Sequence, residues 1–152
     1  MDEQPSFGSQ TGESLAITGS IIFLYSDCYN ASKQFWGEDL ALAVMEDKGA
    51  VIFFKLPWTG GSLAVVKQGV SAALDPPVSA RQGEKDTVMV CLLTNDVDGW
   101  TKRIADRGHP VLQAPLNNDR FGIRNSLVRS PAGYLVEIQQ FVHPQEQRRF
   151  TL

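Results

Sequence analysis

The sequence predicts an α+β fold made of two βαβββ modules, and internal repetition is the main observation behind this prediction. Residues 20–27 (SIIFLYSD) match residues 89–96 (MVCLLTND) in their pattern of apolar and polar positions. In the same way, residues 61–68 (GSLAVVKQ) match residues 133–140 (GYLVEIQQ). Each half of this kind leaves one apolar sheet face uncovered, so the two halves are expected to close on one another.

The first half begins with a strand and a helix. Residues 20–26 are rich in β-branched and aromatic side chains, which favour a strand. Asp27 follows as the expected N-cap of a helix, whose apolar residues Ala31, Phe35 and Trp36 have helical spacing. Three further strands are expected in this half: 40–45, 50–56 and 62–67. The turn between the first two of them is expected at residues 46–49, which read EDKG.

The second half repeats this plan. Residues 89–95 form the expected strand, and Asp96 is the expected N-cap of a helix with apolar residues at helical spacing. Gly108 is a natural residue for the end of that helix. Three more strands are expected: 111–114, 122–128 and 134–141.

The predicted organisation is one domain over residues 16–142. Module one covers residues 16–69 and module two covers residues 87–142. The segment 70–86 contains Pro76-Pro77 and is the expected linker. Residues 1–15 are polar and are interpreted as a flexible leader, and residues 143–152 as a polar, peripheral tail.

Composition excludes several classes of protein. The 152 residues are 43% hydrophobic and 20% charged, which is typical of a globular domain. The net charge of −3 argues against binding a nucleic acid backbone. No apolar run reaches the roughly 18 residues that a membrane helix needs, so we expect no membrane partner. Cys28 and Cys91 do not form a CxxC pair, and two free thiols indicate a cytoplasmic protein.

The end of the sequence resembles a known superfamily. The segment Phe121-Gly-Ile-Arg124 followed by residues 130–138 (SPAGYLVEI) is similar to the closing pattern of the vicinal oxygen chelate superfamily. This superfamily includes glyoxalase I, bleomycin-resistance proteins and extradiol dioxygenases. Ser130 stands where the pattern has an aspartate. The resemblance covers about residues 19–142 and implies a curved, half-barrel-like mixed sheet around a cavity.

The resemblance also implies four metal-ligand positions on the first and last strand of each module. They fall near Ser20, Val65, Met89 and Glu137, and an offset of one residue brings no better donors. Because divalent metals of this class need imidazole nitrogen or carboxylate oxygen, Glu137 alone does not hold one. We therefore expect neither a metal nor another cofactor. His109 and His143 are interpreted as structural or incidental.

The candidate ligand-binding residues are those expected near the cavity: Trp58, Met89, Cys91, Phe121, Arg124 and Glu137. Trp58 and Phe121 are suited to stack on a planar ligand, and Arg124 to bind a carboxylate. Cys91 is more simply explained as a buried thiol. Glu137 is expected to be buried, so it is expected to be protonated, paired with Arg124 or used by the ligand.

Two functions follow from these expectations. The first is metal-independent binding and sequestration of a hydrophobic or aromatic small molecule by a homodimer, similar to the bleomycin-resistance proteins, with antibiotic resistance as one suggested purpose. The alternative is a lyase, isomerase or dioxygenase-like enzyme that uses Glu137 as its general acid or base. The sequence does not name the ligand.

Overall fold

The computed structural model describes residues 17, 19–57, 61–70 and 82–151. The expected leader at residues 1–15 lies outside the described residues, and so does most of the expected linker at residues 70–86. Trp58, one of the candidate ligand-binding residues, lies outside them as well.

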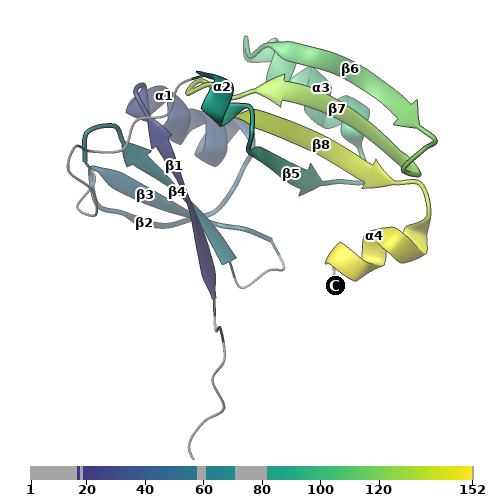
Figure 1. Cartoon of the computed structure of the whole chain (residues 1–152), viewed down its shortest axis with the longest axis horizontal. Helices are drawn as coiled ribbons and strands as arrows, with labels where there is room; N and C mark the ends of the chain where they lie inside the picture. The colour runs from purple at the N-terminus through teal and green to yellow at the C-terminus, as the bar shows by residue number, and fades with distance from the viewer. Residues whose placement is uncertain (1–16, 18, 58–60, 71–81, 152) are drawn as a thin grey trace, which may run out of the picture.

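The first module follows the predicted order of strand, helix and three strands (Figure 1). Its helix ends in one π-helical turn, labelled η1. The strand that was expected at residues 40–45 begins only at Val44. The strands form one sheet in the order β1-β4-β3-β2, with β1 parallel to β4. The bounds of the elements are β1 Ser20–Ser26, α1 Tyr29–Gln34, η1 Phe35–Asp39, β2 Val44–Asp47, β3 Val51–Lys55 and β4 Gly61–Lys67.

The second module repeats this topology in the order β5-β8-β7-β6, with β5 parallel to β8. The predicted α+β fold of two βαβββ modules is therefore confirmed, as two separate mixed sheets that do not close into a barrel. The bounds are α2 Gln82–Lys85, β5 Met89–Leu93, α3 Val97–Asp106, β6 Val111–Asn118, β7 Ile123–Arg129, β8 Leu135–Phe141 and α4 Pro144–Thr151.

The residues that occupy equivalent places in the two modules differ by one position from those that the sequence repeat matches. Asp96 is the N-cap of α3 and accepts a hydrogen bond from the Gly99 amide at 2.8 Å, as predicted. The N-cap of α1, however, is Cys28, so the prediction of Asp27 is wrong. The Ser26 hydroxyl accepts from the Cys28 amide at 3.1 Å and bonds the Ser32 hydroxyl at 2.7 Å, which fixes the longer turn.

This offset changes which residues of module one face the helix. Leu24, Leu63 and Val65 belong to the buried core together with Phe35 and Trp36 of the helical segment. Successive side chains of a strand alternate between its faces, so Ala64 lies on the opposite face. The resemblance implied a metal-ligand position near Val65, but Val65 is part of the core, and the neighbouring residue Ala64 occupies the other face.

A buried carboxylate joins the two modules. Asp39, at the end of η1, has a side chain only 2% exposed and accepts from Arg107 at 2.7 Å. Its second oxygen lies 2.5 Å from His109 Nε2, and the imidazole ring also packs edge-on against Phe35. Arg103 of α3 donates to the backbone carbonyl of Asp39 at 2.9 Å. His109 thus has the structural role that was expected.

The C-terminal segment, expected to be a tail, forms the helix α4 beside the ends of β5 and β8 (Figure 1). Gln147 fixes it there through its side chain. Its Oε1 accepts from the Phe141 backbone amide at 2.9 Å, and its Nε2 donates to the Thr94 backbone carbonyl at 3.4 Å. Phe150 stacks on Phe141 with ring centroids 5.2 Å apart. Within the described residues, no helix is both long and apolar enough to span a bilayer.

Candidate functional site

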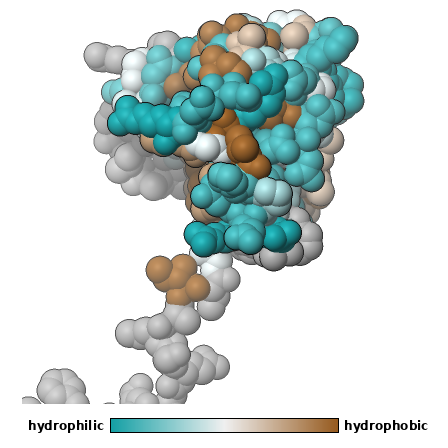
Figure 2. All heavy atoms as spheres, turned by 90° about the vertical axis from the view of Figure 1, so that its right-hand side faces the viewer, coloured by the Kyte–Doolittle hydropathy of each residue, from teal (hydrophilic) through white to brown (hydrophobic). Residues whose placement is uncertain are grey.

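A cavity of about 820 Å³ lies between the two modules, bounded by the segment after η1, the end of β5 and the helix α4. Apolar side chains form most of its walls, as in most small-molecule pockets. Among them are Leu42, Leu56, Trp100, Ile138, Phe141 and Phe150. On the face that includes the ends of β7, β8 and α4, hydrophobic atoms gather in a central band with hydrophilic atoms on both sides (Figure 2).

The wall contributed by module one includes a strained residue. Ala41 lines the cavity and has φ of +56°, in the left-handed region that side chains other than glycine rarely occupy. It is placed between Leu40 and Leu42, which are both buried. Because the core anchors the chain on both sides, the backbone turns sharply here and presents this segment to the cavity. Strain of this kind is often found at functional sites.

A polar row crosses the sheet of module two on the face opposite α3. Glu137 is 7% exposed, and its Oε1 accepts a hydrogen bond from Asn125 Nδ2 at 2.6 Å. Asn125 in turn accepts from Gln113 of β6 at 3.3 Å. Cys91 lies beside Glu137 in the parallel pairing of β5 and β8, and among the candidates that the structure describes it is the one that also lines the cavity.

The polar row holds the Cys91 thiol in its protonated form. Neighbouring protein atoms desolvate the thiol, and the Glu137 carboxylate adds its charge and a hydrogen bond, which together raise the pKa of Cys91 to about 12. A thiol with so high a pKa is a poor nucleophile near neutral pH, because the thiolate is the reactive form. Cys91 is therefore suited to line a binding site and not to attack a substrate.

We expect Glu137→Gln to increase the rate at which iodoacetamide alkylates Cys91 about tenfold at roughly pH 8. The physical reason is that removing the carboxylate charge lowers the pKa of the thiol, so more thiolate is present. The measurement is mass spectrometry over time in a Cys28→Ala background, with Cys91→Ala as the unreactive control. An unchanged alkylation rate would show that Glu137 does not act on this thiol.

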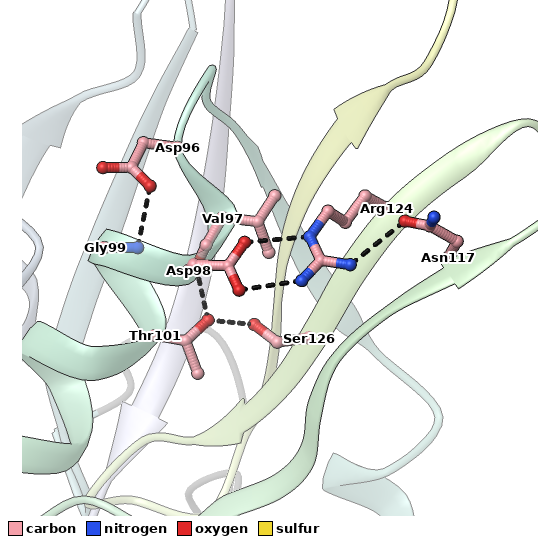
Figure 3. A network of polar contacts seen from close by, with 8 residues as sticks. All are labelled: Asp96, Val97, Asp98, Gly99, Thr101, Asn117, Arg124 and Ser126. Atoms are coloured by element: carbon pink, nitrogen blue, oxygen red, sulfur yellow. Dashed lines mark hydrogen bonds and ion pairs between the residues drawn. The ribbon is translucent and has the colours of Figure 1, made fainter.

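Arg124 does not pair with Glu137, and the expectation that it would is wrong. Its guanidinium donates to both carboxylate oxygens of Asp98 on α3, at 2.9 and 2.8 Å, and to Asn117 at 3.1 Å (Figure 3). Ser126 of the same strand bonds Thr101 of α3 at 2.6 Å, so this face of β7 is the one covered by the helix. The hydrogen bonds that Arg124 donates, together with its charge, hold the pKa of Asp98 below its usual range.

Two other candidates lie outside the described cavity lining. Met89 is 47% exposed at the start of β5, and Phe121 is 61% exposed in the loop before β7, where Arg120 packs over its ring. Sequence reasoning missed Asn125, the actual partner of Glu137, and the α4 residues Gln147 and Phe150. The spacing of Gln147 and Phe150 at i and i+3 was the signal that this segment is a helix with one inward face.

The residues at the four positions do not fit a divalent metal. The expected positions Ser20, Val65 and Met89 offer neither carboxylate nor imidazole. On the face that carries Glu137, Cys91 lies beside it, and the equivalent pair in module one is Ala64 and Phe23, which carry no ligand atoms. Asn125 is already engaged with Glu137. In the part of the chain that the structure describes, no three His, Cys, Asp or Glu side chains gather closely enough to hold a metal ion.

Solved structures confirm the fold. One similar structure is a glyoxalase/bleomycin resistance protein/dioxygenase from Nocardioides, with 18% identity, coverage of 91% of each chain and a TM-score of 0.66. A lactoylglutathione lyase from Agrobacterium tumefaciens has 21% identity over 84% of this chain and 95% of that chain, with a TM-score of 0.59. A glyoxalase/bleomycin resistance protein from Streptomyces sp. CB03234 has 20% identity over 80% and 99%, with a TM-score of 0.57.

These similarities establish the class of fold. The chain has the fold of the vicinal oxygen chelate superfamily, as its closing sequence pattern predicted. Neither a protein-family model nor a curated protein matches the sequence. Because the similar structures include both resistance proteins and a lyase, the fold alone does not determine the function.

Proposed function

We propose that this protein binds and sequesters a hydrophobic or aromatic small molecule without a metal ion. The observation that supports this most strongly is the cavity of about 820 Å³ with mainly apolar walls. Its volume is within the roughly 300–1,000 Å³ typical of ligand pockets. Trp100 and Phe150, from α3 and α4, give the cavity two aromatic rings that suit a planar ligand.

The few ligand atoms at the implied metal positions support a function that does not use a metal ion. Only Glu137 supplies a carboxylate at the four positions, and it already accepts from Asn125 at 2.6 Å. A ligand in the cavity would therefore be held by burial of its apolar surface and by hydrogen bonds, and not by coordination.

We expect the uncharged fluorescent probe N-phenylnaphthylamine to bind with a Kd of about 1–10 µM, which corresponds to roughly −7 to −8 kcal/mol. Dialysis against EDTA, or addition of zinc or nickel, should leave this Kd unchanged. The measurement is a fluorescence titration. Failure to bind the probe, or binding that requires a metal, would contradict the proposal.

An enzyme that uses Glu137 is the second candidate, because this carboxylate is buried and one of the similar structures is a lyase. Two observations weigh against it: Glu137 is not among the described residues that line the cavity, and its Oε1 is bonded to Asn125. Turnover of small carbonyl or ring compounds that is abolished by Glu137→Gln, while probe binding persists, would favour the enzyme.

We also propose that the protein acts in the cytoplasm as a homodimer. Both cysteines are free, which suits a reducing compartment. Module one exposes apolar side chains on β1 and β2, among them Ile21 at 49%, Phe23 at 48% and Met45 at 61%. Exposed apolar residues gathered on one sheet are typical of an interface between subunits.

A further inference from the structure

We infer that the cavity selects an anionic aromatic ligand, such as an aromatic carboxylate, and that Arg148 of α4 is its counter-ion. This inference rests on the proposed function, since it specifies the ligand class for the same cavity. The charges around the cavity are the starting point. Among the described lining residues, Arg148 is the one charged side chain, and neither aspartate nor glutamate is present.

Three polar side chains that line the cavity are already engaged within the protein. Both ends of the Gln147 amide bond the backbone at Phe141 and Thr94. The Thr94 hydroxyl accepts from the Asp96 amide at 3.0 Å, and the Thr151 hydroxyl donates to the Gln147 carbonyl at 2.9 Å. These bonds fix the wall of the cavity and use one hydrogen-bonding function of each hydroxyl and both ends of the Gln147 side-chain amide.

Three polar side chains of the lining are not engaged in this way. Asn95, Gln140 and Arg148 line the cavity, and the described part of the chain offers none of them a side-chain hydrogen bond or an ion pair. All three present N–H donors, and Arg148 has a permanent positive charge that is suited to bind a carboxylate with two parallel hydrogen bonds. A ligand with acceptor atoms and a negative charge is therefore complementary to this set.

None of the described residues that line the cavity carries a carboxylate. Glu137 contacts Cys91, which lines the cavity, but Glu137 itself is not among the described lining residues and is bonded to Asn125. The overall charge of −3 is spread over the whole chain. At physiological ionic strength, charges beyond about 8 Å are largely screened, so the local guanidinium determines the preference.

The test compares three probes that share one ring system: naphthoate, its uncharged amide naphthamide, and the cation naphthylmethylamine. Calorimetric titrations of the full chain in EDTA-treated buffer should give naphthoate about a tenfold lower Kd than naphthamide, and the amine the highest Kd. Arg148→Gln should remove the difference between naphthoate and naphthamide. Arg149→Gln is the matched control, because Arg149 is the next residue of α4, is exposed, and is not among the described lining residues.

The outcomes separate this inference from the proposed function. Equal Kd values for naphthoate and naphthamide in the wild type would overturn the inference and leave the proposed function intact. An equal loss of naphthoate preference in both arginine variants would also overturn it, since general surface charge would then be the cause. If neither the acid nor the amide binds below about 1 mM, both are contradicted.

Discussion

Replacing Asp39 with alanine is expected to lower the melting temperature by about 10 °C, because it removes the buried carboxylate that joins the two modules. The variant leaves His109, whose side chain is 16% exposed, and Arg107 without their shared partner. Breaking a buried ion pair by removing one partner costs about 3 kcal/mol or more. A domain of this size loses roughly 2–4 °C for each kcal/mol. The measurement is calorimetric or fluorescence-detected thermal unfolding.

The matched control for this variant is Asp106→Ala. Asp106 also pairs with a cation, Lys102 on the same helix, but both side chains are largely exposed, at 60% and 76%. An exposed pair of this kind contributes about 0.5 kcal/mol or less. A melting temperature for Asp39→Ala that equals the Asp106→Ala value would mean that the Asp39 cluster does not hold the modules together.

The double variant Gln147→Ala/Phe150→Ala should weaken binding of N-phenylnaphthylamine about 30-fold. Gln147 supplies both side-chain hydrogen bonds that tie α4 to β8 and to Thr94, and Phe150 supplies the ring stacked on Phe141. Phe150 is 60% exposed, so its ring is free to be covered by the bound probe, and losing such an aromatic contact costs about 2 kcal/mol, which corresponds to this change in Kd. Without these contacts the helix no longer closes the cavity.

Arg149→Ala is the control here, as it removes an exposed side chain of the same helix. Hydrogen exchange gives a second readout, because the backbone amides of residues 144–151 should exchange faster in the double variant and at the wild-type rate in the control. Unchanged probe affinity in a double variant whose α4 amides exchange faster would show that the helix is not a wall of the binding site.

The repeated pattern of strand, helix and three strands was sufficient to predict the fold, because hydrophobic periodicity specifies each module locally. The relative offset of the modules was not predictable from that pattern. All residues of β4 from Gly61 to Val66 are buried, so the strand has no alternation of apolar and polar positions to show which face is which. A one-residue error moves every side chain to the opposite face, and Val65 was misplaced in this way.

The site was predicted in part. Glu137 is buried, as expected, and Cys91 lines the cavity although a buried thiol was the simpler explanation for it, while Arg124, Ser126 and Val128 share one face of β7. The partner of Glu137 was wrong because strand pairing depends on long-range register. Leu127 is opposite Glu137 in the pairing of β7 and β8, and Arg124 is opposite Gln140. Because alternate residues share a face, Asn125 lies on the same face of the sheet as Glu137, and Arg124 lies on the other. The polar composition of residues 143–152 concealed a helix that closes the cavity.

The most direct test of the central claim is a crystal structure of the EDTA-treated protein soaked with naphthoate, with anomalous data to detect metals. We expect the naphthalene ring in the cavity near Trp100 and Phe150, the carboxylate within hydrogen-bonding distance of Arg148, and no anomalous peak at Glu137. A ligand bound on the Glu137 and Asn125 face together with a metal at Glu137 would contradict it.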